Sequence, residues 1–371
     1  MRLYRRLLLI ATLLAFAVIA LGAYVRLSDA GLGCPDWPGC YGHWLGVPDA
    51  PHEQHAAAQA FPDRPVDTGK AWKEMLHRYL AGTLGLLILT LTILAWRREL
   101  RSRQSPALPT ALLGIVGLQA ALGMWTVTLL LKPVIVTLHL IGGMTTLSLL
   151  AGMAVARREI SSATAVAAST RLLAFAALLA IIVQIALGGW VSSNYAALAC
   201  PDFPTCQGQW QPEMDFAHAF SLHRELGQTT DGQLLPLAAL TAIHWTHRLG
   251  AVVVALIVGT LALSLIRRQG WRTWGNLLAG LLLVQIALGI GNVLWSLPLA
   301  LAVAHNLGAA CLLTATLSVN ILIHRANRRN PGIAARPGQP SRLPGHCQPA
   351  PPGIQPLIPG IIRKTGTQIT C

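Results

Sequence analysis

The feature that most constrains this chain is a series of eight apolar segments, each long enough to cross a lipid bilayer. A helix needs about 20 residues to cross about 30 Å of hydrocarbon. Only 11% of the 371 residues are charged and 53% are hydrophobic, which is typical of membrane proteins. The segments lie at about 7–24, 77–96, 108–130, 134–156, 172–191, 242–266, 274–294 and 298–322. We therefore predict an all-α integral membrane protein with eight transmembrane helices.

The cations of this basic chain, whose net charge is +14, gather mainly in short runs at the ends of these segments. The runs are Arg2, Arg5 and Arg6; Arg97, Arg98, Arg101 and Arg103; Arg157 and Arg158; Arg267, Arg268 and Arg272; and Arg325, Arg328 and Arg329. All five fall on one side of the predicted membrane, which the positive-inside rule makes cytoplasmic. Both termini are then cytoplasmic, the long connections at 25–73 and 192–241 face outward, and nucleic acid is not expected as a partner.

An internal repeat divides the chain into two halves. At an offset of 166 residues, CPDWPGC (34–40) aligns with CPDFPTC (200–206), and His139 aligns with His305. At an offset of 170, His77 aligns with His247. Four helices is an even number, so both halves insert in the same direction. We expect two parallel-repeat four-helix bundles, 1–158 and 159–326, followed by a disordered, cytoplasmic, Pro-rich tail at 327–371.

The four histidines named above recur at matched depth on alternate helices. An ionisable side chain inside a membrane helix is costly and by default indicates a functional site. Two imidazoles facing each other across a helical bundle are what axial ligation of haem iron needs. The alternative is that they are buried histidines bonded to neighbouring helices. Their matched depth favours two haem sites, one in each half.

The two predicted haem sites differ beside the ligand. Glu74 stands one turn before His77, on the same helix face, whereas the equivalent residue in the second half is His244. A partly desolvated carboxylate at the rim of a haem pocket can act as a base on water or stabilise developing positive charge. Alternatively, Glu74 interacts with the helix dipole at the helix entry. The difference suggests that one site does chemistry and the other holds an electron carrier.

The paired cysteines, Cys34 with Cys40 and Cys200 with Cys206, lie in outward-facing loops. An oxidising compartment favours a disulfide within each loop. Such a disulfide is either a structural link or an electron relay. The wide spacing argues against a CxxC-type metal site.

Polar residues near the histidines have less specific interpretations. Gln119, Gln184 and Gln285 each precede an Ala-Leu-Gly sequence and are typical of interhelical hydrogen bonds and close packing. Arg78 and Arg248 follow His77 and His247, where they either pair with haem propionates or extend to the membrane interface.

Five motifs in order resemble the haem A synthase family of Gram-negative bacteria and mitochondria, over about residues 5–325. They are GAYVRLSDAGLGCPDWPGC (22–40), EMLHR (74–78), TLHLIGG (137–143), HWTHRLG (244–250) and AHNLG (304–308). The resemblance implies oxidation of the C8 methyl group of haem O to a formyl group, which gives haem A for haem-copper oxidases. Two successive hydroxylations with water as the oxygen source, and loss of water from a gem-diol, are the implied route.

The resemblance also implies roles for individual residues. His77 and His139 match the ligands of the substrate haem, and His247 and His305 match those of a resident haem b. Glu74 matches an essential acidic residue. The loop disulfide between Cys34 and Cys40 matches one proposed to take part in electron or haem transfer.

The implied setting is the cell inner membrane, in a multi-pass protein. The implied partners are haem O synthase, which supplies substrate, haem-copper oxidase assembly factors, which receive product, and an external membrane electron acceptor. The oligomeric state stays open, a homo-oligomer included.

Two alternative functions remain at this point. A two-haem quinol or disulfide oxidoreductase would hold both porphyrins permanently, but it has no evident need for a carboxylate at one pocket only, as Glu74 provides. A transporter of haem or lipid-like cargo would use the same parallel repeat, but it predicts broken helices at mid-membrane, and no clear Gly/Pro pair marks them.

Overall fold

The computed structural model describes residues 2–101, 105–157 and 164–329, and in these residues every regular element is helical. Eight helices are long and apolar enough to cross a membrane, which confirms the predicted number. They are α1 (Arg2–Leu27), α3 (Thr68–Trp96), α5 (Ala107–Thr128), α6 (Pro133–Val155), α7 (Ala168–Ser193), α9 (Leu237–Ile266), α10 (Arg272–Leu294) and α11 (Leu299–Arg329). The first three residues of the predicted Pro-rich tail, 327–329, belong to α11, because this helix continues to Arg329, and the rest of the tail lies outside the described residues.

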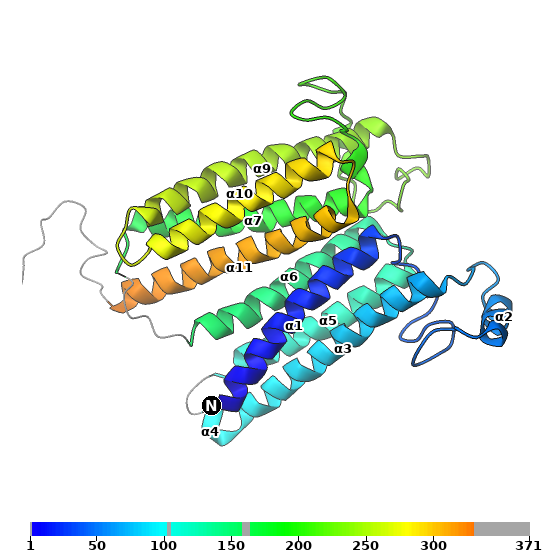
Figure 1. Cartoon of the computed structure of the whole chain (residues 1–371), viewed down its shortest axis with the longest axis horizontal. Coiled ribbons are helices and arrows are strands. Elements are labelled where there is room, and N and C mark those ends of the chain that lie inside the picture. Colours follow the sequence, from blue (N-terminus) through cyan, green and yellow to red (C-terminus); the bar gives the residue numbers. More distant parts are fainter. Residues whose placement is uncertain (1, 102–104, 158–163, 330–371) are drawn as a thin grey trace, which may run out of the picture.

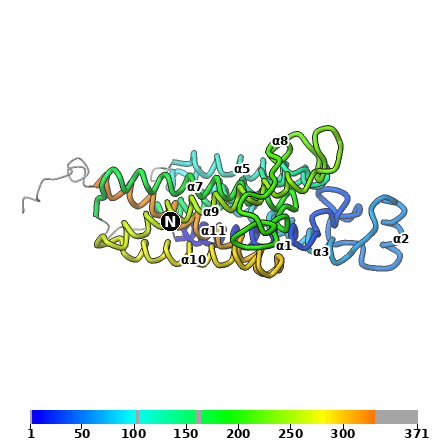
Figure 2. Tube along the Cα trace, turned by 90° about the horizontal axis from the view of Figure 1, so that it is seen from above, coloured from blue at the N-terminus to red at the C-terminus, as the bar shows by residue number. Residues whose placement is uncertain are grey.

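Short elements occupy the connections. The first long loop holds α2 (Pro51–Ala60), and the second holds the 3₁₀ turn η1 (Ala196–Leu198) and α8 (Phe216–Ala219). Helix α4 (Arg98–Arg101) follows α3 directly. The loops with α2 and α8 gather at one end of the bundle, opposite the start of α1 and the end of α11 (Figures 1 and 2). Hereafter this is called the loop end.

Helices α3 and α9 begin outside the apolar segments that predicted them. Helix α3 starts at Thr68 because the carboxylate of Asp67 accepts a hydrogen bond from the Lys70 N–H (3.0 Å), which caps the first turn. Helix α9 starts directly after Pro236. These added turns bring polar residues such as Glu74 and His244 onto regular helix, in register with the histidines that follow.

The eight helices contact one another in two rings of four. Helices α3 and α6 each contact α1 and α5, and α9 and α11 each contact α7 and α10. The ring members α3 and α6 are therefore diagonal to each other, as are α9 and α11. Helix α6 joins the rings by packing against α7 and α11, and α1 also packs against α11 (Figure 1).

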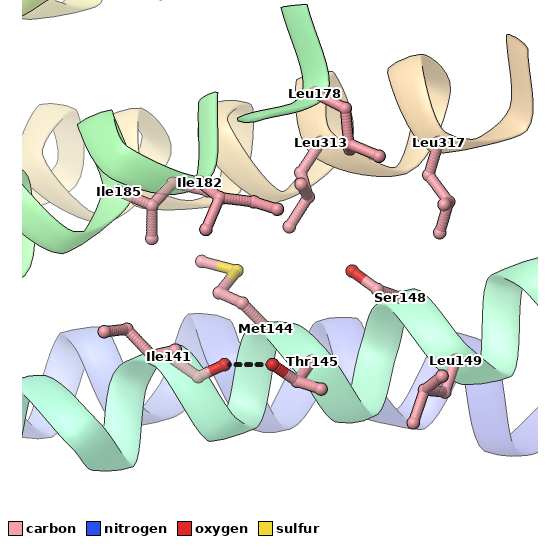
Figure 3. A pocket seen from close by; sticks show the side chains of 10 residues that line it. All are labelled: Ile141, Met144, Thr145, Ser148, Leu149, Leu178, Ile182, Ile185, Leu313 and Leu317. Atoms are coloured by element: carbon pink, nitrogen blue, oxygen red, sulfur yellow. Dashed lines mark hydrogen bonds between the residues drawn. The ribbon is translucent and has the colours of Figure 1, made fainter. Parts of the chain in front are cut away.

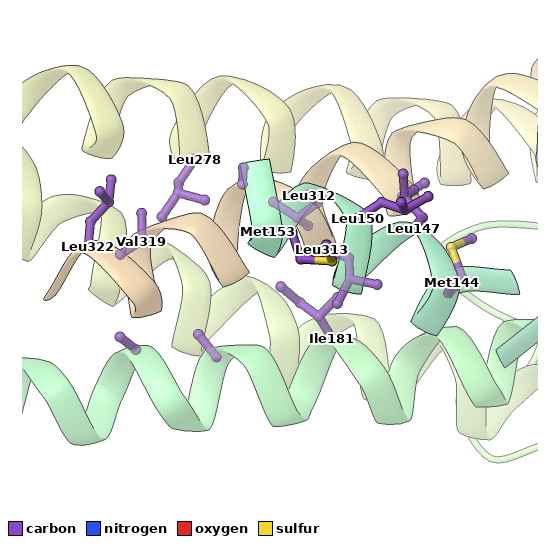
Figure 4. Packing of buried hydrophobic residues seen from close by; sticks show 14 of the residues in the cluster. Met144, Leu147, Leu150, Met153, Ile181, Leu278, Leu312, Leu313, Val319 and Leu322 are labelled. Carbon is purple, nitrogen blue, oxygen red and sulfur yellow. The ribbon is translucent and has the colours of Figure 1, made fainter. Parts of the chain in front are cut away.

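The buried core follows this junction between the rings. Figure 4 shows Met144, Leu147 and Leu150 of α6 beside Ile181 of α7 and Leu313 of α11, all of which belong to one buried cluster. Lipid is as apolar as these side chains, so close packing rather than exclusion of water holds the helices together.

Polar contacts join the rings at the loop end. Arg26, at the end of α1, donates hydrogen bonds to the Ser192 carbonyl (3.0 Å) and the Tyr195 hydroxyl (2.5 Å). The hydroxyls of Thr137 on α6 and Ser193 on α7 lie 3.1 Å apart. The two rings are thus fixed relative to each other near the ends of α1, α6 and α7.

Candidate functional site

The four histidines lie on the diagonal helices of the two rings and all are partly buried. They are His77 on α3, His139 on α6, His247 on α9 and His305 on α11. The imidazoles of His77 and His139 are close enough to interact electrostatically, and so are those of His247 and His305. Each pair therefore lies on the two diagonal helices of its own ring.

A glycine on the neighbouring helix lies against each histidine. The distance from a Cβ atom built on the glycine to Cε1 of the histidine would be 2.9 Å for Gly22 and His77, 3.4 Å for Gly123 and His139, 3.0 Å for Gly188 and His247, and 3.1 Å for Gly289 and His305. At three of the four positions a methyl group would come within 3.1 Å of the ring. The absent side chain is what lets each imidazole lie close to the neighbouring helix.

These glycines were missed as site residues, although the sequence marks them. Each ends an Ala-Leu-Gly sequence, and the chain contains this tripeptide at 20–22, 121–123, 186–188 and 287–289. Three of the four tripeptides follow a glutamine, and the sequence pattern was interpreted only as helix packing. The first tripeptide follows Val18 instead, so the fourfold recurrence was not recognised.

The geometry of the histidine pairs fits haem better than a metal ion held by protein alone. Within residues 2–101, 105–157 and 164–329, no three His, Cys, Asp or Glu side chains converge to hold a metal ion. Haem brings four ligands of its own and needs one imidazole on each face. The Nδ1 atoms of His77, His139 and His305 are buried, so the exposed surface of each of these residues lies on other atoms.

Glu74 is buried at the loop end of the first pair, with a relative exposure of 5%. Its Oε2 accepts a hydrogen bond from the Cys34 N–H (3.0 Å), and its Oε1 pairs with the Arg78 guanidinium. Arg78 also donates to the carbonyls of Asp36 (3.0 Å) and Gly39 (2.5 Å). Glu74 is therefore bonded to the cysteine loop as well as being one turn from His77.

The second ring keeps the arginine contact but not the carboxylate. Arg248 donates to the carbonyls of Thr205 (2.8 Å) and Cys200 (2.9 Å), and its Nε lies 3.2 Å from Nε2 of His244. His244 is also 5% exposed, and its Nδ1 donates to the Ala196 carbonyl (3.1 Å). The arginines thus hold the loops over the histidine pairs, a role that neither sequence interpretation included.

Both cysteine pairs form disulfides within their own loops, Cys34 with Cys40 and Cys200 with Cys206. An aspartate folds each loop by accepting two backbone N–H groups. Asp36 accepts from Tyr41 (2.6 Å) and Gly42 (2.8 Å), and Asp202 accepts from Gln207 (2.5 Å) and Gly208 (3.0 Å). These bonds close the loops independently of the disulfides.

The pKa of Asp202 is lowered from its ordinary value by these contacts. The Thr205 hydroxyl makes the largest contribution, and the N–H groups of Gly208 and Gln207 add to it. Hydrogen bonds to a carboxylate favour its ionised form.

A separate cavity of about 200 Å³ lies between the rings, on the sides of α6, α7 and α11. Figure 3 shows its lining, which is aliphatic except for Met144, Thr145 and Ser148. The Thr145 hydroxyl already donates to the Ile141 carbonyl (2.8 Å). With no ionisable group in its lining, this cavity offers no acid-base chemistry, and the histidine pairs remain the candidate site.

Comparison with known proteins finds relatives that match over most of this chain. A protein named heme A synthase from Shewanella oneidensis is 44% identical over 322 residues, which cover 86% of this chain and 95% of that protein. Proteins of the same name from a Chelativorans species and from Methylobacterium radiotolerans are each 31% identical, over 314 and 332 residues. These matches cover 78% and 83% of this chain, and 82% and 86% of the relatives.

The family model described as COX15-CtaA, cytochrome oxidase assembly protein, matches residues 5–317. This range includes all eight membrane helices except the first three residues of α1 and the last turns of α11, together with both histidine pairs and both cysteine loops. The chain therefore belongs to the COX15-CtaA family of cytochrome oxidase assembly proteins.

Proposed function

We propose that this protein is a haem A synthase, an oxidoreductase that converts the C8 methyl group of haem O into the formyl group of haem A. The observation that carries the proposal is a pair of histidines in each ring. A buried carboxylate, Glu74, lies beside the pair in the first ring, and the equivalent residue in the second ring is His244. The family membership supports this activity, and so does the name of the 44% identical relative, heme A synthase.

The reaction balances with water as the oxygen source. A methyl group and one water give a formyl group, four electrons and four protons, so an external electron acceptor in the membrane is required. Two hydroxylations, followed by loss of water from a gem-diol, distribute the oxidation over two rounds of two electrons each. An enzyme of this kind must therefore remove protons as well as electrons at one methyl group.

We assign the substrate to the first ring, where His77 and His139 bind haem O. Glu74 is the one carboxylate next to this pair, and we propose that it accepts a proton from water or stabilises positive charge near the reacting carbon. Its bonds to the Cys34 N–H and to Arg78 hold it in one orientation. The role assigned to Glu74 does not depend on electron transfer through the disulfide of that loop.

We assign a resident haem b to the second ring, where His247 and His305 would hold it. When bound, haem b supplies one-electron transfer. The chain contributes the two imidazoles, and it places the non-acidic His244 where the first ring has Glu74. A site that only carries electrons needs no proton acceptor at that position.

Backbone conformation supports the proposal that residues 1–158 and 159–326 are repeats. The eight non-glycine residues with positive φ in the described chain form four pairs that are 166 positions apart. These pairs are Asp29 and Tyr195, Tyr41 and Gln207, Leu130 and Ser296, and Leu131 and Leu297. Left-handed backbone is costly for such residues, so matched positions indicate matched turns.

We further propose that the protein lies in the cell inner membrane with both termini cytoplasmic. The arginine runs at the end opposite the cysteine loops support this orientation. Haem O synthase, haem-copper oxidase assembly factors and a membrane electron acceptor are the proposed partners.

The test is to purify the protein from cells with and without coexpressed haem O synthase and to identify the extracted haems. We expect haem b alone without the synthase, and haem A in addition with it. Without the synthase, His247→Ala or His305→Ala should abolish the low-spin haem b spectrum, and His77→Ala should leave it intact. Loss of haem b from both rings to an equal degree would instead support a permanent two-haem electron conduit.

A further inference from the structure

Two glutamines donate to the backbone carbonyls of the proposed haem b ligands. The Gln184 Nε2 on α7 donates to the backbone carbonyl of His247 (2.9 Å) and lies 3.1 Å from its Nδ1. The Gln285 Nε2 on α10 donates to the backbone carbonyl of His305 (3.0 Å). The predicted interhelical hydrogen bonds of these two residues are confirmed, and each bond ends on the ligand residue itself.

A glycine three residues after each ligand makes room for the amide. A Cβ atom built on Gly250 would lie 2.2 Å from Oε1 of Gln184, and one on Gly308 would lie 2.3 Å from Oε1 of Gln285. No larger side chain fits with the amide in place. Each of these ligands therefore sits between a glycine on the neighbouring helix, which contacts its ring, and an amide that holds its backbone.

The first ring keeps the residues for this contact at one ligand and lacks them at the other. Beside His139, Gln119 and Gly142 stand where the second ring has Gln285 and Gly308, and a Cβ atom built on Gly142 would lie 1.7 Å from Nε2 of Gln119. At His77 the residue types themselves differ. Val18 occupies the position equivalent to Gln184, and Leu80 occupies the position equivalent to Gly250.

We propose that Gln184 and Gln285 are positioning residues that retain haem b in the second ring, and that the absence of this amide beside His77 allows haem exchange in the first. This inference rests on the proposed function. A resident cofactor must stay through many turnovers, whereas haem O must enter and haem A must leave. In hydrocarbon no water competes for the ligand carbonyl, so the amide fixes the height of the histidine relative to the facing helix.

The first experiment removes the amide without changing the size of the side chain. Gln184→Met and Gln285→Met are made in protein produced without haem O synthase, so that haem b is the haem observed. The rate of haem transfer to excess apomyoglobin is measured, together with the low-spin electron paramagnetic resonance signal. Interhelical hydrogen bonds in membranes contribute about 0.6 and up to about 1.7 kcal/mol. We expect transfer to be about 3-fold and at most about 18-fold faster, and a shifted low-spin signal.

The second variant displaces the amide and leaves the glutamine in place. Gly250→Ala should accelerate transfer to a similar degree, because its methyl group would overlap the amide oxygen. The double variant with Gln184→Met should be no faster than the faster single variant, since both remove one bond. Gly280→Ala on α10 is the matched control, because a Cβ there meets nothing within 4 Å, and its transfer rate should equal that of the wild type.

The third variant builds the missing amide site in the first ring. Val18→Gln combined with Leu80→Gly should increase the amount of haem O or haem A that stays bound through purification after coexpression with haem O synthase. The haem b signal should not change. Retention equal to the wild type would overturn the part of the proposal that concerns exchange.

The outcomes separate the inference from the function on which it rests. Haem b that is ligated by His247 and His305, but is released at the wild-type rate from Gln184→Met, Gln285→Met and Gly250→Ala, overturns the inference alone. Wild-type protein that holds no haem b in the second ring overturns the proposed function and the inference together.

Discussion

Glu74→Gln tests the assignment of catalysis most directly, because the structure separates its contacts from its charge. Glutamine has nearly the same shape, and its Oε1 can still accept the Cys34 N–H that now lies 3.0 Å from the carboxylate. The charge that pairs with Arg78 is lost. If Glu74 acts as a base, the methyl oxidation should slow by about 10²–10⁴-fold.

The contacts of Arg78 limit how much Glu74→Gln can lower the stability of the fold. Removing one partner of a buried ion pair typically costs about 3–5 kcal/mol. The Glu74 and Arg78 side chains are 6% and 13% exposed, so this range is an upper bound on the loss of stability. Arg78 keeps its hydrogen bonds to the Asp36, Pro38 and Gly39 carbonyls, which reduce the loss. We therefore expect the variant to insert and to bind haem b normally.

The assay is extraction of haems from purified protein after coexpression with haem O synthase. Glu74→Gln should accumulate haem O or a hydroxylated intermediate in place of haem A. His244→Gln, at the equivalent position of the second ring, is the matched control and should still give haem A. Near-normal haem A from Glu74→Gln would refute a catalytic carboxylate.

Arg78→Met separates two explanations of a loss of activity. It breaks the loop contacts and the ion pair but leaves the carboxylate in place. A loss of haem A as large as that of Glu74→Gln would mean that Glu74 acts by holding the cysteine loop. A smaller loss is expected if the carboxylate itself takes part in the reaction.

Two further predictions concern the outer loops. Mass mapping of unreduced peptides should find one disulfide within each loop and a free Cys311, and any linkage between the loops would contradict the structure. The lowered pKa of Asp202 means that its hydrogen bonds to Gln207 and Gly208 are fully present above the unfolded pKa near 3.8 and are lost as the pH falls through the lower folded value. Hydrogen exchange should show these two amides still protected at pH 4, and Asp202→Ala should remove that protection at pH 7.

The helix count and the histidine pairing could be predicted because both depend on patterns that the bilayer imposes. Apolar length predicts a span, and an ionisable residue inside a span is rare enough to be informative. The outward extensions of α3 and α9 could not be predicted in this way, because their polar first turns fall outside any apolar window. The cap at Asp67 was a local indication that hydropathy does not use.

Contacts between segments far apart in the sequence were harder to predict. Arg78 and Arg248 are next to the proposed ligands in sequence, which suggested propionates, yet they bind carbonyls of loops about 40 residues away. Gly22 was not recognised because a glycine has no side chain from which to infer a contact. Only the position of the His77 ring on another helix gives it a role.

The fourfold recurrence of a glycine against a histidine has an evolutionary consequence. In the proposed haem sites, one helical hairpin with this contact would supply a single ligand, so two hairpins would already make a complete iron site. A chain of half this length would therefore have been useful before any duplication. Once the unit was doubled, one copy could keep an inherited cofactor while the other accumulated changes, at positions such as 18, 74 and 80, that would have harmed a molecule with only one site.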